Sequence, residues 1–139
     1  MYDYFYNELS YASLDMIEHN ATFNLGTVNS SDLSDVDSLY SDENGYDTYT
    51  GIPPIVLMYP SDYLYSKLSD ETWLHNGGNN EWLLSSNSNG DDVISINTSG
   101  TLSSSDPNNS YKVRPSVFII DSIEILGGNG TADDPFVRL

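Results

Sequence analysis

The stretch that decides the fold prediction is Tyr111-Lys112-Val113-Arg114-Pro115-Ser116-Val117-Phe118-Ile119-Ile120. It is the longest apolar run with β-branched and aromatic residues, and polar segments rich in Ser, Asn, Asp and Gly bound it on both sides. This pattern predicts a buried strand over 113–120 at the centre of a sheet, with the proline near its start, where no ladder hydrogen bond is lost. Arg114 is one of only four Lys and Arg residues. We expect it to pair with a carboxylate or carbonyl of the fold, a ligand role being the alternative.

The first part of the chain has helical periodicity. Apolar residues recur there at three- and four-residue steps with no Gly or Pro between them, at Tyr2, Phe5, Leu9, Ala12 and Met16. The spacing predicts a helix over 2–19, or two shorter helices if Ser10 caps the second. We expect the tyrosines that crowd this segment to form a seam between helix and sheet rather than a binding face: Tyr2, Tyr4, Tyr6 and Tyr11.

Short apolar or alternating runs separated by polar segments fill the rest of the chain. They predict strands at 21–25, 55–59, 82–84, 93–96, 123–126 and 135–137, with a hairpin return near 100–102. Ser61 is the expected N-cap of a helical turn over 61–65. The polar segments 27–50, 85–92 and 103–110 are expected to be loops. Together these elements predict a single α+β domain over 1–139, with the helix first and a small, twisted, mostly antiparallel sheet.

Charge excludes some partners. Four Lys and Arg stand against 21 Asp and Glu, which gives a formal net charge of −17. Such a surface repels phosphate backbones and anionic lipid, so we expect no nucleic acid partner. The acidity is compatible with cation binding, with salty or extracellular surroundings, or with simple solubility. No apolar run approaches about 18 residues and the first residues do not resemble a signal peptide, so neither membrane insertion nor an export signal is expected in the chain as given.

The segment 27–50 carries the densest acidic cluster. Its oxygen-bearing side chains are of the kind that calcium prefers, and the candidate ligands are Asp35, Asp37, Asp42 and Glu43. Their spacing does not fit an EF-hand loop. The alternative is a solvated loop, although a loop of this length is unusual in a compact domain unless it is functional or contains short structure of its own.

Catalytic patterns are weak. The sequence contains no cysteine, which removes disulfides, zinc thiolate sites and a cysteine nucleophile. Neither His19 nor His75 lies in a context typical of a serine hydrolase, and 127–130 is not followed by the lysine of a phosphate loop. The carboxylates lie mostly in polar loops, where a raised pKa for general acid catalysis is hard to arrange. We therefore predict no enzyme activity and no cofactor, with calcium left open.

Several motifs together resemble a known family. They are, in order, Asp15-Met16-Ile17-Glu18, Ala21-Thr22-Phe23-Asn24-Leu25-Gly26, Leu57-Met58-Tyr59-Pro60-Ser61-Asp62-Tyr63, Trp82-Leu83-Leu84-Ser85, Val113-Arg114-Pro115-Ser116-Val117, and Ile123-Glu124-Ile125-Leu126 with 127–131 and Asp134-Pro135-Phe136. From about Tyr11 onward, the chain resembles the C-terminal domains of pilin-like and other surface proteins of Gram-positive bacteria. That family is similar in turn to the C-type-lectin-like fold of sulfatase-modifying proteins.

The resemblance implies a C-type-lectin-like domain displayed outside the cell, with long loops over a small twisted sheet. The motif residues themselves are expected to be scaffold. Family members usually carry a further N-terminal strand region, and often a pilin-type apolar helix, so we expect an N-terminal part of the family domain to be missing here. Because the related enzymes use cysteines or metal and this chain has no cysteine, their activity is not implied.

Two functions follow as predictions. The first is an extracellular binding or adhesion module for a glycan or protein ligand, because amide and carboxylate groups can bond to sugar hydroxyls while an aromatic face stacks on the ring. The second is a structural, pilin-like filament subunit that assembles with identical copies through its N-terminal helix. The predicted ligand-binding residues lie in the polar loops and are Asn76, Asn79, Asn80, Asn87, Asn89, Asp91, Asp92, Asp106, Asn108, Asn109 and Tyr111.

Five Asn-x-Ser/Thr sequences suit an exposed surface in either case if the host attaches glycans: Asn20, Asn29, Asn97, Asn108 and Asn129. Several matches are expected by chance in a sequence so rich in Asn, Ser and Thr.

Overall fold

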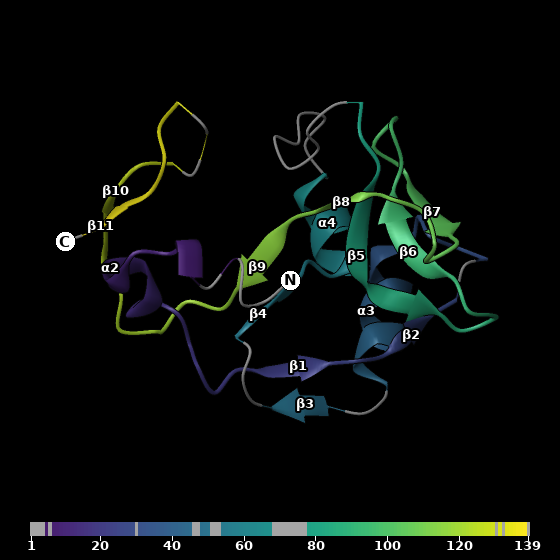
Figure 1. The fold of residues 1–139 in the computed structure, drawn as a ribbon, viewed down its shortest axis with the longest axis horizontal. Helices are drawn as coiled ribbons and strands as arrows, with labels where there is room; N and C mark the ends of the chain where they lie inside the picture. Colours follow the sequence, from purple (N-terminus) through teal and green to yellow (C-terminus); the bar gives the residue numbers. More distant parts are fainter. Residues whose placement is uncertain are drawn as a thin grey trace.

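The protein has an α+β fold, as predicted (Figure 1). The computed structural model describes residues 5, 7–29, 31–45, 48–50, 54–67, 78–129, 131 and 133–138. Its elements, in chain order, are α2 (Tyr11–Leu14), β1 (Thr22–Asn24), β2 (Thr27–Val28), α3 (Val36–Asn44), β3 (Thr48–Thr50), β4 (Ile55–Leu57), α4 (Pro60–Ser66), β5 (Glu81–Asn87), β6 (Val93–Ile96), β7 (Leu102–Ser105), β8 (Lys112–Val113), β9 (Pro115–Val117), β10 (Ile125–Gly127) and β11 (Val137–Arg138).

A five-stranded mixed sheet is built around β5. Antiparallel β6 covers one edge of β5, and β7 continues the sheet beyond β6. Two short strands, β2 and β8, run parallel to β5, β2 at its end and β8 at its start. Between them, the N–H of Leu84 donates to the carbonyl of Met58 at 3.0 Å. One edge of β5 is therefore completed by three segments that are far apart in the chain.

The hydrophobic core lies between this sheet and helices α3 and α4. Side chains of β5 alternate, so that Leu83 points inward and packs with Ile94 and Ile96 of β6. Leu39 of α3 and Tyr63 of α4 complete the cluster from the helices. Tyr63 is fully buried, and its hydroxyl donates to the carbonyl of Gly100 at 2.9 Å, which satisfies the one polar group that its burial brings inside.

The stretch expected to be the central strand is an exposed connector instead, so that prediction was wrong. Within 112–120, β8 pairs with β5, β9 pairs with β4 in a separate two-stranded sheet, and 118–120 bonds to 16–18. Ile119 is 61% exposed. The pairing partner changes at Arg114, because Pro115 has no N–H to continue the ladder with β5. The sheet is accordingly mixed rather than mostly antiparallel.

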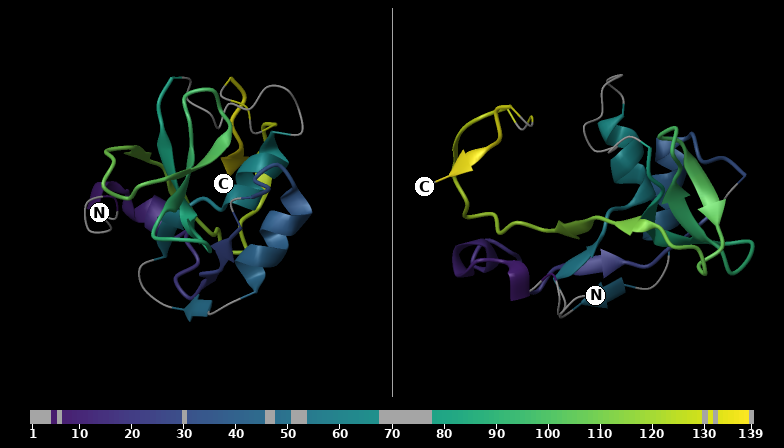
Figure 2. Two further views of the ribbon diagram at one scale, coloured as in Figure 1. Left: turned by 90° about the vertical axis from the view of Figure 1, so that its right-hand side faces the viewer. Right: turned by 45° about the horizontal axis from the view of Figure 1, so that its top comes forward.

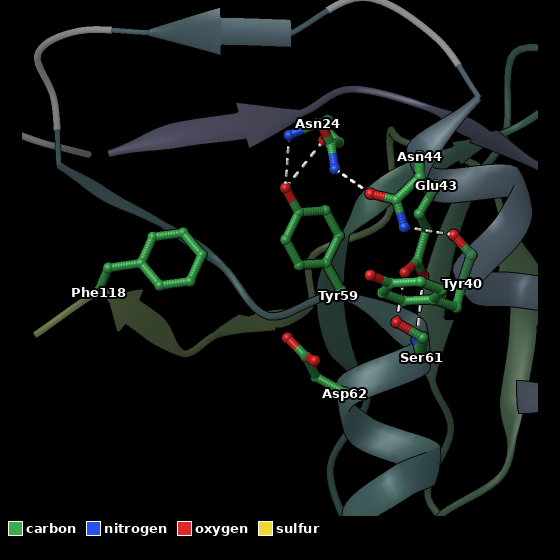
Figure 3. Close-up of a pocket in the computed structure, with 8 residues that line it drawn as sticks. All are labelled: Asn24, Tyr40, Glu43, Asn44, Tyr59, Ser61, Asp62 and Phe118. Atoms are coloured by element: carbon green, nitrogen blue, oxygen red, sulfur yellow. Dashed lines mark hydrogen bonds between the residues drawn. The ribbon is translucent and has the colours of Figure 1, made fainter. Parts of the chain in front are cut away.

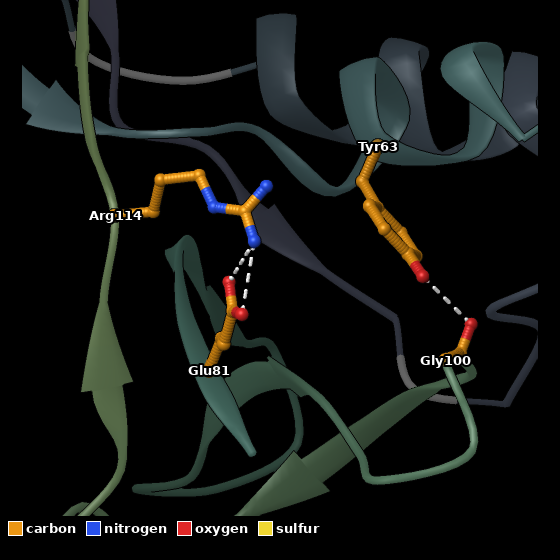
Figure 4. A network of polar contacts seen from close by, with 4 residues as sticks. All are labelled: Tyr63, Glu81, Gly100 and Arg114. Atoms are coloured by element: carbon orange, nitrogen blue, oxygen red, sulfur yellow. Dashed lines mark hydrogen bonds and ion pairs between the residues drawn. The ribbon is translucent and has the colours of Figure 1, made fainter. Parts of the chain in front are cut away.

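Arg114 has the carboxylate partner that the sequence predicted. Its Nη2 lies 2.9 Å from Oε1 and 2.8 Å from Oε2 of Glu81, a buried residue at the start of β5 (Figure 4). The pair lies near Tyr63. Burial raises the pKa of the Tyr63 hydroxyl, the Glu81 carboxylate raises it further, and the Arg114 guanidinium opposes both. Arg114 thus fixes β8 and the following connector to the core.

The N-terminal segment divides at Ser10, as the alternative prediction held. The Ser10 hydroxyl accepts from the N–H of Ser13 at 3.1 Å and caps α2. Residues of this segment lie against β4 and β9 rather than against the five-stranded sheet. Tyr11 is exposed, so it forms no seam with the sheet, and Tyr2, Tyr4 and Tyr6 lie outside the described residues.

Three further expectations need correction. The segment 27–50 is not one loop, because it contains β2, α3 and β3, and α3 begins at an N-cap formed by Asp35. Ser61 is not an N-cap, because α4 begins one residue earlier, with Tyr59 at the cap position and Pro60 in the first turn. Residues 85–87 of the predicted loop 85–92 belong to β5, and residues 103–105 of the predicted loop 103–110 belong to β7.

Most of the other predicted strands are present within one or two residues. These are β1, β4, β6, β10 and β11, and β7 is the predicted hairpin return. Figures 1 and 2 show β10 and β11 at the end of an arm, away from the five-stranded sheet. None of the helices in the described part of the chain has both the length and the apolar character that crossing a bilayer requires.

Candidate functional site

A polar cleft of about 270 Å³ opens where the end of α3 meets the start of α4 (Figure 3). Strand β1 and the residue after β9 close its other sides. We call it the polar cleft, and its lining residues are Asn24, Tyr40, Glu43, Asn44, Tyr59, Ser61, Asp62 and Phe118. Four separate segments of the chain therefore contribute to one site.

Glu43 lines this cleft, and its carboxylate caps the start of helix α4. Tyr59, at the N-cap position of α4, makes no side-chain capping bond. Glu43 supplies that bond from α3, because the N–H of Ser61 donates to its Oε1 at 2.9 Å and the Ser61 hydroxyl donates to its Oε2. Burial raises the pKa of Glu43, and the hydrogen bonds from Ser61 oppose the shift. A carboxylate at a helix N-terminus also faces the positive end of the helix dipole.

A second set of bonds ties β1 to α3 and α4. The Tyr59 hydroxyl accepts from the N–H of Asn24 at 2.7 Å and donates to the Asn24 carbonyl at 3.0 Å. Burial raises the pKa of this hydroxyl. The Asn24 side-chain amide donates to Oδ1 of Asn44, whose own amide donates to the carbonyl of Tyr40 at 2.7 Å. The Tyr59 hydroxyl and one N–H of each of these two amides thus find acceptors inside the protein.

Asp62 differs from Glu43. Its carboxylate makes no hydrogen bond or ion pair with any other residue that the structure describes, and Figure 3 shows it pointing toward the space near Tyr59 and Phe118. Burial raises its pKa. Two aromatic rings flank the cleft: Tyr40 is 65% exposed, and Phe118 is 47% exposed and stacks on Phe23 with ring centroids 5.2 Å apart. The cleft therefore combines accessible aromatic surfaces with a carboxylate that has no partner in the described part of the chain.

An apolar pocket of about 310 Å³ lies elsewhere, where the N-terminal segment meets β4 and β9. It shares no residue with the polar cleft. Its lining is Phe5, Glu8, Leu9, Ser13, Met16, Ile17, Ile55, Pro115, Val117 and Ile119.

The predicted ligand loops do not form one surface. The residues 78–80 precede β5 and the turn 88–92 follows it, so a seven-residue strand of roughly 20 Å separates them. Asn76 lies outside the described residues. The carbonyl of Asn80 accepts from the N–H of Lys112 at 2.9 Å, and Asn79 is also engaged in an interaction.

The turn after β5 is partly structural. Asn87 is buried, its amide donates to the hydroxyl of Ser104 at 2.9 Å, and its Oδ1 accepts from the N–H of Asn89. Asp92 accepts from the same Ser104 hydroxyl at 2.9 Å. These bonds hold the turn to β7, so Asn87 and Asp92 do not belong to an open ligand surface. Asn89 and Asp91 are exposed, and Asn89 donates to Oδ1 of Asn29 at 3.1 Å.

The segment after β7 packs on the sheet. Asp106 forms a turn by accepting from the N–H and the side-chain amide of Asn108, both at 2.8 Å. Tyr111 stacks on Trp82 with ring centroids 4.4 Å apart, and the Asn109 amide lies 3.4 Å from its hydroxyl. Leu83 faces the helices, so its neighbour Trp82 faces the opposite side of the sheet. The contact between Tyr111 and Trp82 therefore places the segment after β7 on that opposite face.

The calcium candidates are not arranged as a metal site. Within the described residues, no three His, Asp or Glu side chains are grouped so that they could hold a metal ion. Asp35 accepts from the N–H groups of Asp37 and Ser38, Asp42 accepts from the N–H of Asn29 at 3.0 Å, and Glu43 caps α4. Asp37 lies in the first turn of α3. Helix capping and chain linkage thus account for most of this acidic cluster.

Four of the five candidate glycosylation residues are exposed, namely Asn20, Asn29, Asn108 and Asn129. Asn97 is half-buried, and its Oδ1 accepts from the N–H groups of Ser99 and Thr101 while its amide donates to Thr101 Oγ1 at 2.6 Å. A glycan on Asn97 would therefore have to open this turn.

The sequence prediction missed the polar cleft, because its residues come from β1, α3, α4 and the connector after β9. Only Glu43 among them was a candidate, and it was a candidate for calcium. One local signal was present: Pro60-Ser61-Asp62 begins a helix directly after a strand, and side chains at such a junction often line a site. No family model matches the chain, and neither a curated protein nor a solved structure matches it.

Proposed function

We propose that the protein is a non-enzymatic binding module and that the polar cleft holds its ligand, a glycan. The observation that carries this proposal is the carboxylate of Asp62, which has no partner among the described residues, in a cleft that is also lined by two exposed aromatic rings, Tyr40 and Phe118. An aromatic face packs on the C–H face of a sugar ring, and a carboxylate accepts hydrogen bonds from sugar hydroxyls. Display outside the cell is part of the proposal and rests on the resemblance to bacterial surface proteins.

Binding is favoured over glycoside cleavage by the state of the two carboxylates. Glycosidases generally need a pair of carboxyl groups on either side of the bond that breaks. In the cleft, both oxygens of Glu43 accept hydrogen bonds from Ser61, so this group is committed to capping α4. Among the described residues that line the cleft, Asp62 is then the one carboxylate available to a ligand.

A glycan array tests the proposal with two matched tyrosine variants. Tyr40→Ala removes one wall of the cleft, and Tyr65→Ala removes a ring of α4 that is not among the cleft residues. The two rings are 65% and 66% exposed, so neither change should unfold the protein. We expect Tyr40→Ala to lose capture of the bound glycans and Tyr65→Ala to retain it.

Asn89→Ala on the same array tests the predicted loop surface. If Asn89→Ala loses capture and Tyr40→Ala does not, the ligand lies at the loops instead. If the unaltered protein captures no glycan, the proposed function is wrong.

A second candidate, a structural subunit that assembles with copies of itself, is favoured by a different observation. The arm formed by 117–138 exposes many large apolar side chains, Val117, Phe118, Ile119, Ile125, Leu126, Phe136 and Val137. An isolated two-stranded hairpin is marginal in water, and contiguous exposed apolar surface usually has a partner. Two of these residues, Val117 and Ile119, also line the apolar pocket between the N-terminal segment and β9.

Sedimentation velocity over a wide concentration range tests assembly. We expect oligomers that Phe136→Ser dissolves without a change in thermal stability, because Phe136 is exposed in the single chain. Tyr65→Ser is the control, since it removes an exposed ring outside the arm. A protein that stays monomeric at every concentration would exclude this second candidate.

A further inference from the structure

The polar groups of the cleft bond largely to one another. The amides of Asn24 and Asn44 each donate one hydrogen bond inside the protein, and so do the hydroxyls of Tyr59 and Ser61 and the N–H of Ser61. The oxygens of Asp62 accept no hydrogen bond from the described part of the chain. A ligand that pairs with Asp62 has to bring a donor of its own.

The cleft also lacks positive charge. None of its lining residues is Lys or Arg. Two of the four basic residues of the chain are committed elsewhere: Lys67 donates to the carbonyl of Gly100 at 2.9 Å, and Arg114 pairs with Glu81. Asp62 is an exposed residue at the mouth of the cleft; partial burial raises the pKa of its carboxylate, and no cation among the lining residues opposes this shift. In a protein of net charge −17, a cationic ligand is drawn toward such a site.

The aromatic rings favour an organic cation over a metal ion. A protonated amine over the face of a tyrosine or phenylalanine is attracted by the electrons of the ring. Tyr40 and Phe118 both expose ring surface to the cleft. The volume of about 270 Å³ is at the small end for ligand pockets and suits a single ring-sized group.

We propose that the polar cleft recognises a glycan through a free amino group, as carried by a de-N-acetylated amino sugar, with Asp62 as the counter-ion of the ammonium and Tyr40 and Phe118 flanking the sugar ring. This inference rests on the proposed function and names the substrate class of the same site.

Titration calorimetry with two trisaccharides tests it. One probe is a trimer of glucosamine, and the other is the same trimer fully N-acetylated, which keeps the rings but removes the charge. The buffer is slightly acidic, so that the amines are protonated, with about 0.15 M salt to limit attraction beyond roughly 8 Å. We expect the glucosamine trimer to bind roughly tenfold or more tightly than the acetylated trimer, as one charge-assisted hydrogen bond supplies.

Matched charge variants separate the site from the general field. Asp62→Asn and Asp91→Asn each remove one negative charge, and Asp91 lies on the exposed turn after β5. We expect Asp62→Asn to weaken binding of the glucosamine trimer roughly tenfold and Asp91→Asn to change it less than about twofold. Thermal unfolding of both variants serves as the folding control. If Asp62→Asn does not fold, Tyr40→Ala takes its place.

Each other outcome overturns the inference in a distinct way. Equal affinity for both trimers means that the cleft binds glycans without recognising an amine, and the proposed function survives. Equal losses in the two charge variants mean that the net charge alone attracts the probe. A trilysine peptide that binds as tightly and depends on Asp62 assigns the amine to a protein ligand. Absence of binding to either trimer removes the inference, and the glycan array then decides whether the proposed function fails with it.

Discussion

At the scale of single residues, the two carboxylates of the polar cleft, Glu43 and Asp62, differ in their contacts. Glu43 is enclosed and receives two hydrogen bonds from Ser61, while Asp62 faces the opening without a partner among the described residues. Burial raises the pKa of both groups. In both cases, then, the charged form is less favoured in the folded protein than in the unfolded chain.

Glu43→Gln should change how stability depends on pH. A glutamate in an unfolded chain has a pKa of about 4.3, and folding raises that of Glu43, so between these two values the folded protein binds more protons. Its contribution to stability therefore falls as pH rises through this window. The amide keeps an acceptor for the N–H of Ser61 and has no charge to bury. We expect Glu43→Gln to gain thermal stability relative to the unaltered protein as pH rises from about 4 to neutral.

Asp62 is present in both proteins, so the difference between their melting temperatures, followed as a function of pH, reports on Glu43. A difference in stability that stays constant with pH would contradict the raised pKa of Glu43, and a variant that loses relative stability as pH rises would show that the charge at the start of α4 outweighs its burial.

At the scale of elements, local patterns were sufficient for β1, β4, β6 and α4, whose apolar spacing or turn residues are visible in a short window. They failed at the centre of the sheet. The inner face of β5 includes Glu81, Ser85 and Asn87, which are buried because distant residues satisfy them or pack over them. Of the more apolar 113–120, only Val113 pairs with β5, while 115–117 pairs with β4 and Ile119 bridges to Ile17 near the surface. A prediction from hydrophobicity alone therefore placed 113–120 at the centre of the sheet, where the structure has β5.

The polar cleft was beyond a sequence prediction for the same reason. It exists only where the ends of β1, α3 and β9 meet the start of α4, and each lining residue is ordinary in its own segment. Arg114 could be predicted, because a cation beside a strand in an acidic chain needs a carboxylate. Which carboxylate it meets depends on the register of β8 along β5.

The docking of α3 against the link between β1 and β2 gives a prediction at this scale. A Cβ on Gly26 would lie 2.3 Å from the carbonyl oxygens of both Asp42 and Glu43, so Gly26→Ala has to push strand and helix apart. We expect a loss of about 1–3 kcal/mol, measured as a lower midpoint in urea. Gly90→Ala is the matched control, because nothing lies within 4 Å of its added Cβ. Equal midpoints for the two variants would contradict this packing.

At the scale of the whole molecule, the net charge of −17 acts against the compact state through self-repulsion. The acidic side chains of α3 show how part of this charge is used, since Asp35 caps the helix and Asp42 holds the N–H of Asn29. One oxygen of each carboxylate is therefore already engaged in a bond that the fold uses.

Salt should therefore stabilise the protein by screening alone. We expect sodium and calcium chloride at equal ionic strength to raise the melting temperature by the same amount. A ligand that binds only the folded state would add to this effect. An extra rise in millimolar calcium that a chelator reverses would contradict the prediction and restore the acidic segment as a metal site.

The shared edge of β5 has a consequence for the protein during its synthesis. The ribosome releases β2, Met58, β5 and β6 well before Lys112 and Val113, which complete the start of that edge. Until then, the backbone groups of Glu81 and Trp82 on that side lack their strand partner and are open to pairing with another nascent chain. A chain truncated after residue 110 should accordingly be digested by protease at β5 far faster than the finished protein.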